Sequence, residues 1–267
     1  MHPQANVVPR RRIESSPTFW ALVAITGVGA GLAGGLLMRL FHALQHLAWS
    51  YETGGFVAAV AAASPLRRIV VVLLAGVLVT AGLLILRARK GGHALELTVS
   101  IWFRAGESPP LKTLARSVLS IAIVALGAAL GREGALKQTG AVIAHLLASA
   151  RRLSPPERRL LTACGAGAGL AAAYNLPVGG ALFAIEVLLG TLTLPVALPA
   201  LAASILGAAA SWLLLPAQPT YDTPAYRLSL PQLGWAVGMG LVAGAAALAY
   251  TRLIAWATRG RPRGGAG

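Results

Sequence analysis

The chain has 267 residues, of which 56% are hydrophobic and only 12% are charged. Soluble globular proteins carry roughly 25% charged residues, so this composition excludes a water-soluble fold, and its hydrophobicity excludes an intrinsically disordered chain. The apolar runs are long and do not alternate, which excludes an outer-membrane barrel. The sequence therefore predicts an all-α, multi-pass membrane protein.

The charge is strongly basic, with 23 lysines and arginines against eight acidic residues and a formal net charge of +15. Such a balance is also found in nucleic-acid-binding proteins, but here the basic clusters lie at the ends of apolar runs, as cytoplasmic flanks of membrane proteins do. We therefore expect no nucleic-acid partner. We expect the chain to lie in a cell membrane, a bacterial inner membrane or its equivalent, in contact with membrane lipid and with both termini in the cytoplasm. Glu52, Glu107 and Asp222 would then face outward, whereas Arg67 and Arg68 oppose this orientation. The clusters are at residues 10–12, 87–90, 151–159 and 259–263.

Four runs are long enough to cross a bilayer, which takes about 20 residues. After a basic N-terminal segment at residues 1–17, the first two runs are 18–49 and 69–86, with a loop at 50–66 between them. The last two are 194–215 and 233–257, separated by a proline-rich loop at 216–230. Residues 18–257 thus form the predicted membrane domain, and residues 258–267 a basic, glycine-rich tail.

The middle of the chain is interrupted. The apolar segments 91–103, 135–150, 160–174 and 178–190 are short, the last two being split by residues 175–177. Ser154 is predicted to cap a helix, because Glu157 follows it three residues later. Interrupted membrane helices leave backbone groups unpaired unless protein or a water-filled cavity surrounds them, and they are typical of ion or substrate sites.

Three acidic residues, Glu96, Glu133 and Glu186, lie in or beside apolar sequence. A charge there costs several kcal/mol unless it is paired or faces water, so each is a candidate functional residue. Glu133 stands at the start of a short helical segment, between Gly131-Arg132 and Gly134. Free N–H groups and the positive end of a helix attract anions. An ionised carboxylate there competes with a small anion for these N–H groups, and a protonated one leaves them to the anion. This predicts a pH-sensitive gate. A local pairing of Glu133 with Arg132 or Lys137 is the equally weighted alternative.

No enzyme chemistry is indicated. The sequence shows no nucleophile–base set, phosphate loop or cysteine framework, and its one cysteine, Cys164, lies in an apolar stretch. His42 and His46 are one helical turn apart, but no further ligand joins them, so an interfacial position is favoured over a metal site. We expect no cofactor and no metal.

Two motifs carry a family resemblance. Residues 131–140, GREGALKQTG, and residues 163–186, ACGAGAGLAAAYNLPVGGALFAIE, resemble signatures of the CLC family of voltage-gated-type chloride channels and chloride/proton antiporters. The resemblance implies tilted, interrupted helices, here about one inverted-repeat half plus one further helix, in a truncated membrane domain. It also implies chloride or a similar small anion as partner, and pairing as a homodimer or with a full-length or complementary CLC-type chain, through the late short helices and residues 194–215.

The resemblance makes Glu133 the gating glutamate, with backbone N–H groups of its neighbours as anion donors. It places Arg116 beneath the anion path, with an interfacial position as the alternative. Gly92 stands where the family has an anion-binding serine, so that a backbone N–H or His93 would take its place. Glu186 matches a structural glutamate, and Val187 stands where antiporters carry a proton-transferring glutamate. The implied anion-binding residues are Gly131, Arg132, Gly134, Ala135, Gly92 and His93.

These features predict passive anion permeation gated by a protonatable Glu133. Val187 cannot relay a proton, which disfavours strict coupling. Two alternatives remain: a non-transporting or inactive membrane subunit that lacks half the pore, and a proton-coupled chloride or fluoride transporter. No motif of the family's second half follows residue 257.

Overall fold

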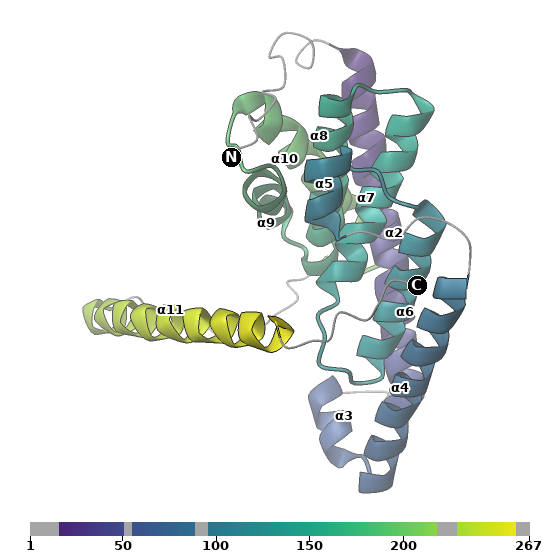
Figure 1. Cartoon of the computed structure of the whole chain (residues 1–267), viewed down its shortest axis with the longest axis vertical. Helices are drawn as coiled ribbons and strands as arrows, with labels where there is room; N and C mark the ends of the chain where they lie inside the picture. The colour runs from purple at the N-terminus through teal and green to yellow at the C-terminus, as the bar shows by residue number, and fades with distance from the viewer. Residues whose placement is uncertain (1–15, 51–54, 89–95, 218–228, 260–267) are drawn as a thin grey trace. The chain divides into compact units, whose positions relative to one another are not determined.

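The computed structural model describes residues 16–50, 55–88, 96–217 and 229–259, and over these ranges its regular structure is entirely helical (Figure 1). The chain divides into two compact units, residues 1–220 and 221–267. The second unit contains one described helix, α11 (Leu230–Arg259). The first contains the other helices and the candidate site.

The four predicted spans are confirmed. In the described residues, four helices are long and apolar enough to cross a membrane: Pro17–Trp49, Pro65–Ala88, Leu194–Ser211 and Leu230–Thr258. They correspond to α2, α4, α10 and α11. The prediction of a plain loop over 50–66 is wrong in part, because α3 (Phe56–Ala62) forms there from an alanine-rich run that favours helix.

The interrupted middle consists of α5 (Leu97–Arg104), α6 (Pro110–Ala125), α7 (Glu133–Ala150), α8 (Pro155–Tyr174), α9 (Pro177–Leu182) and the π-helical turn η1 (Phe183–Leu189). Each break has a local cause. Gly127 after α6 and Asn175 after α8 adopt the left-handed backbone conformation, with φ of 100° and 55°, which ends a right-handed helix. The predicted cap of α8 is confirmed, since Ser154 and Glu157 form a reciprocal capping box.

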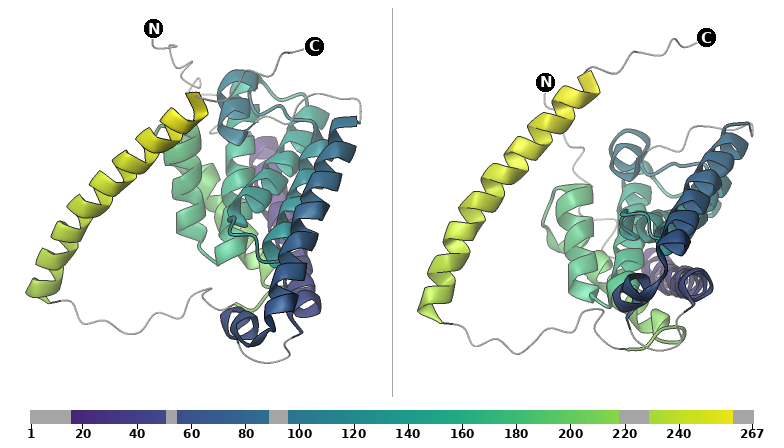
Figure 2. Two further views of the ribbon diagram at one scale, coloured as in Figure 1. Left: turned by 60° about the horizontal axis from the view of Figure 1, so that its bottom comes forward. Right: turned by 90° about the horizontal axis from the view of Figure 1, so that it is seen from below.

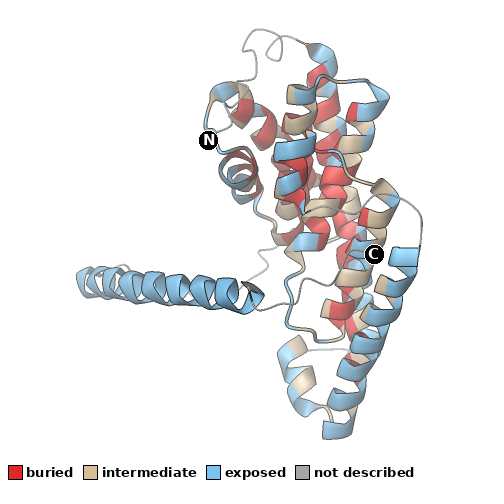
Figure 3. Cartoon of the chain, in the orientation of Figure 1, coloured by how far each residue is buried: buried red, intermediate tan, exposed pale blue. Residues whose placement is uncertain are grey.

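Buried residues concentrate where α2, α7, α8 and α10 meet (Figure 3). A second, smaller cluster packs the later part of α2 against α6, the start of α7 and the end of α8. Leu136 is fully buried there and Ala135 nearly so. Helix α4 runs beside α6 (Figure 2). The second cluster therefore fixes the first turn of α7 in place.

Small residues let these helices approach backbone to backbone. A methyl group added to Gly165 on α8 would overlap the carbonyl oxygen of Gly140 on α7, and one added to Gly140 would overlap that of Gly165. Gly31 on α2 meets the backbone of Gly207 on α10 in the same way. The glycines of the core are therefore contact points between helices.

Replacing Gly165 with alanine is expected to lower the free energy of unfolding by about 1–2 kcal/mol. Overpacking costs about 1–3 kcal/mol, and alanine's better helix propensity, about 1 kcal/mol, offsets part of it. Gly76→Ala is the matched control, because nothing lies within 4 Å of the position its methyl group would take. Thermal unfolding in detergent should show a lower Tm for the first variant and an unchanged or higher one for the second. Equal Tm values would contradict the close contact.

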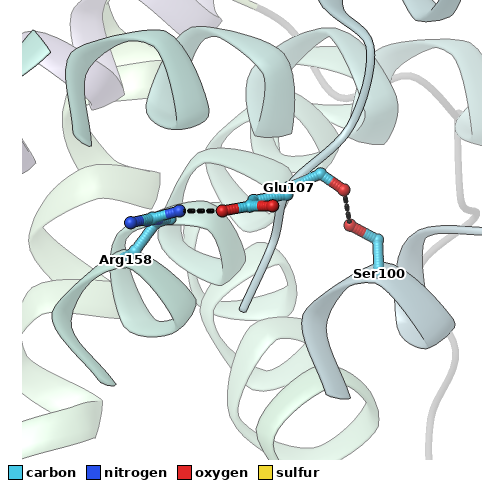
Figure 4. A network of polar contacts seen from close by, with 3 residues as sticks. All are labelled: Ser100, Glu107 and Arg158. Carbon is cyan, nitrogen blue, oxygen red and sulfur yellow. Dashed lines mark hydrogen bonds and ion pairs between the residues drawn. The ribbon is translucent and has the colours of Figure 1, made fainter. Parts of the chain in front are cut away.

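The outward orientation predicted for Glu107 and the cytoplasmic one predicted for Arg158 cannot both hold, because the two residues lie together. The Glu107 carboxylate forms an ion pair with Arg158, which belongs to a basic cluster assigned to the cytoplasmic side, and its backbone carbonyl accepts a 2.7 Å hydrogen bond from Ser100 (Figure 4). The turn after α5 therefore returns to the side where α8 begins. A lone acidic residue in a loop carries little orientation information, since acidic residues contribute weakly to membrane topology.

Candidate functional site

The first turn of α7 has an open N-terminus. Glu133 is its first residue, and no side chain caps the helix. Gly131 and Gly134 are exposed, and nothing lies within 4 Å of the position that a side chain on Gly134 would take. The first N–H groups of a helix have no partner within it, so this turn presents donors toward open space.

The half-buried side chain of Glu133 bends back over the preceding backbone. A methyl group added to Gly131 would overlap the Glu133 carboxylate in this conformation, so the carboxylate would have to move aside. The Oε1 atom of Glu133 accepts a 2.9 Å hydrogen bond from the Tyr174 hydroxyl, at the last residue of α8. Within the described ranges, neither Arg132 nor Lys137 forms an ion pair with Glu133. The recorded partner thus comes from another helix.

Arg132 lies between two aromatic rings. Its guanidinium carbon is 4.9 Å from the ring centre of Tyr174 and 5.7 Å from that of Phe41. Stacking of this kind holds a guanidinium in place while leaving its N–H groups available. The arrangement puts a fixed positive charge directly before the helix start.

A cavity of about 210 Å³ adjoins Arg132. Asn175 and Trp212 line part of it, and the Trp212 indole donates a 2.8 Å hydrogen bond to the Asn175 side-chain oxygen. Together with the helix start, the cavity offers a small anion space, hydrogen-bond donors and positive charge. A cation would find the dipole of α7 unfavourable.

The structure brings Gly131, Arg132, Glu133, Gly134 and Ala135 together at this turn. It places the other predicted residues elsewhere: Arg116 is exposed on α6, and Glu186 and Val187 are exposed on η1. Gly92 and His93 lie outside the described residues.

Glu96 caps the start of helix α5. It precedes α5 and accepts hydrogen bonds from the Val99 backbone at 3.2 Å and the Thr98 hydroxyl at 3.0 Å. An acidic residue at this position stabilises a helix start. Its presence beside apolar sequence is thus explained in part by capping.

Sequence reasoning missed Tyr174 as the partner of Glu133. The two residues are 41 positions apart, and a single sequence does not show which helix ends meet. The available signal was its place as the last residue before the break at Asn175–Pro177, since helix breaks in membranes line sites.

The fold and this turn define a class: a membrane protein of interrupted helices with an anion-attracting helix start. A model of the voltage-gated chloride channel family matches residues 77–266. This is more than half of the chain, and the protein belongs to that family.

Curated relatives carry the name voltage-gated ClC-type chloride channel ClcB. That of Yersinia pseudotuberculosis is 35% identical over 179 residues, covering 64% of this chain and 42% of the relative. That of Escherichia coli K12 is 35% identical over 184 residues, covering 66% and 43%. The chain therefore spans about two fifths of the length of these relatives.

A solved structure has the same fold. It is described as a slow cyanobacterial Cl⁻/H⁺ antiporter and superposes with a TM-score of 0.73, covering 92% of this chain and 60% of that one at 20% identity. The all-helical membrane fold predicted from the sequence is thereby confirmed.

Proposed function

We propose that the chain supplies the gate and part of the anion path of a chloride channel-type membrane protein, with passive permeation controlled by protonation of Glu133. One observation carries the proposal. An acidic side chain lies at the uncapped start of α7, folded over Gly131 and held by Tyr174. Ionised, it takes the place that an anion would occupy at the same N–H donors.

The geometry supports a simple cycle. Protonation removes the negative charge of Glu133, which weakens its attraction to the helix start and to Arg132. Chloride then binds at the backbone N–H groups of residues 131–135, where the helix dipole favours an anion. Deprotonation returns the competing carboxylate. Chloride permeation should therefore increase as the pH falls.

Passive permeation is favoured over proton coupling by η1. Val187, exposed there, has no titratable group, and its neighbour Glu186 is exposed on the same short turn. The similar cyanobacterial structure is described as an antiporter, so coupled transport of chloride or fluoride remains the alternative to be tested.

A non-transporting membrane subunit is the second candidate. It is favoured by one observation: the chain spans 42% of the Yersinia relative, and the family resemblance implies an anion path built from two halves. Such a subunit would keep the fold and the pairing surface without conducting anions.

We further propose that residues 18–257 act as one membrane domain, with residues 1–17 and 258–267 in the cytoplasm. A bacterial inner membrane or its equivalent is the proposed location. The surface we propose for pairing with a second chain there consists of α9, η1 and α10, whose exposed leucine and valine side chains suit contact with a partner as well as with lipid. Among them are Val178, Leu182, Val187, Leu194 and Leu198.

The decisive experiment is chloride efflux from liposomes containing the purified 267-residue chain, measured from pH 7.5 to pH 4.5. Chloride-selective efflux that rises toward low pH, without proton movement, supports the channel. Efflux that pumps protons against their gradient supports coupling. No efflux from the chain alone, together with a stable complex with a full-length relative, supports the subunit.

A further inference from the structure

Lys137 is a second charged residue on the α7 segment that begins at Glu133. It follows Glu133 by four residues, about one helical turn, so the two side chains lie on the same face of α7. A charged residue among the helices of a membrane protein is costly unless it is paired or faces water. The gate proposed for Glu133 assigns no role to Lys137.

The ammonium group of Lys137 contacts an aromatic ring and forms no ion pair with an acidic residue of the described ranges. Its Nζ atom is 4.7 Å from the ring centre of Phe183, the first residue of η1, a distance typical of a cation–π contact. The side chain is half-buried. Within the described ranges, Lys137 forms no ion pair and donates no hydrogen bond, so its three N–H donors are available there.

Glu96 attracts this ammonium from a distance. The two groups interact electrostatically without being in direct contact. The Glu96 carboxylate is meanwhile engaged with the Val99 backbone and the Thr98 hydroxyl at the start of α5. The acidic group therefore reduces the positive field at Lys137 but does not occupy its donors.

We propose that Lys137 forms a second anion-binding position, one turn further along α7 than Glu133, for a small inorganic anion of the halide class. This inference rests on the proposed function, because it places the position on the same anion path. The negative charge of Glu96 weakens anion binding there, so that the anion can dissociate. Conduction requires binding that is strong enough for an anion to enter and weak enough for it to leave. Lys137 and Glu96 thus act in opposite directions on one bound ion.

The opposite signs make the inference testable. The experiment is calorimetric titration of the purified chain with sodium bromide, with the Glu133 carboxylate left in place so that bromide at the first position does not mask the second. Lys137→Met is expected to weaken bromide binding about tenfold and Glu96→Gln to strengthen it about threefold, the direction Coulomb's law gives for each lost charge. Lys137→Arg keeps the charge and should bind within about threefold of the parent.

Three outcomes would overturn the inference: a parent that binds no bromide, a Lys137→Met variant that binds as the parent does, or a Glu96→Gln variant that binds more weakly. The last would mean that the two charges merely stabilise the α5–α7 packing. The Tm of each variant separates this from misfolding, and Lys137→Arg and Glu96→Gln still decide the question if Lys137→Met does not fold.

Failure of the gate is distinguishable. If chloride efflux and its pH dependence are the same with and without the Glu133 carboxylate, the gate is wrong, whereas bromide titration of the Lys137 and Glu96 variants is read without any flux. Conversely, substitution of Glu133 could change efflux while the Lys137 and Glu96 variants bind bromide as the parent does. That result would refute the second anion position and leave the gate standing.

Discussion

Chloride efflux through Glu133→Gln is expected to be at least about tenfold faster than through the parent at pH 7.5, and independent of pH. Glutamine has nearly the shape of glutamate but carries no charge and does not titrate. In the gate we propose, the carboxylate competes with chloride for the α7 donors, and a hydrogen bond to an ionised group contributes about 1.5–3 kcal/mol. Removing a competitor held this strongly changes an equilibrium by about one order of magnitude or more. Liposome efflux across a pH series measures both effects.

Glu157→Gln is the matched control, since Glu157 also lies in the first turn of a helix but belongs to the capping box of α8. It should leave efflux and its pH dependence as in the parent, while lowering the Tm slightly. A Glu133→Gln variant whose efflux still rises at low pH would show that another group senses protons.

Tyr174→Phe is expected to raise chloride efflux at pH 7.5 several-fold. The hydroxyl of Tyr174 donates a 2.9 Å hydrogen bond to Glu133, and in the gate we propose it holds the carboxylate in its blocking position. Phenylalanine keeps the ring against Arg132 and removes the hydroxyl. A hydrogen bond to a charged group contributes about 1.5–3 kcal/mol, so chloride displaces the carboxylate more readily without it. Liposome efflux measures the change.

Tyr250→Phe, on α11, tests whether the effect is specific to the tyrosine that touches Glu133. Its chloride efflux should equal that of the parent. Slower efflux through Tyr174→Phe would mean that the hydroxyl favours the open rather than the blocking position of the carboxylate.

Much of this fold could be predicted from the residues alone. Long apolar runs give α2, α4, α10 and α11, because crossing a bilayer requires length and hydrophobicity, both of which are local properties. The start of α7 at Glu133 and the break at Asn175 follow from glycine and proline, which punctuate helices. The capping box at Ser154 is equally local.

The failures concern long-range relations. The pairing of Glu107 with Arg158 spans 51 residues and the contact of Tyr174 with Glu133 spans 41, and neither separation leaves a trace in local periodicity. Phe41 reaches Arg132 from α2 for the same reason. For Glu96, capping hydrogen bonds account for much of what looked like an unexplained intramembrane charge.

The backbone contacts between α7 and α8 restrict how any opening can occur. Gly140 meets Gly165, and Leu136 meets Gly169, each with a carbonyl oxygen where a side chain would otherwise stand. Helices interlocked at two successive turns cannot slide or tilt without steric overlap, since packed interiors deform poorly. In the gate we propose, opening at Glu133 would therefore be a torsional rotation about its own χ angles, a fast motion of a few atoms with a small activation enthalpy, rather than a collective rearrangement of the bundle.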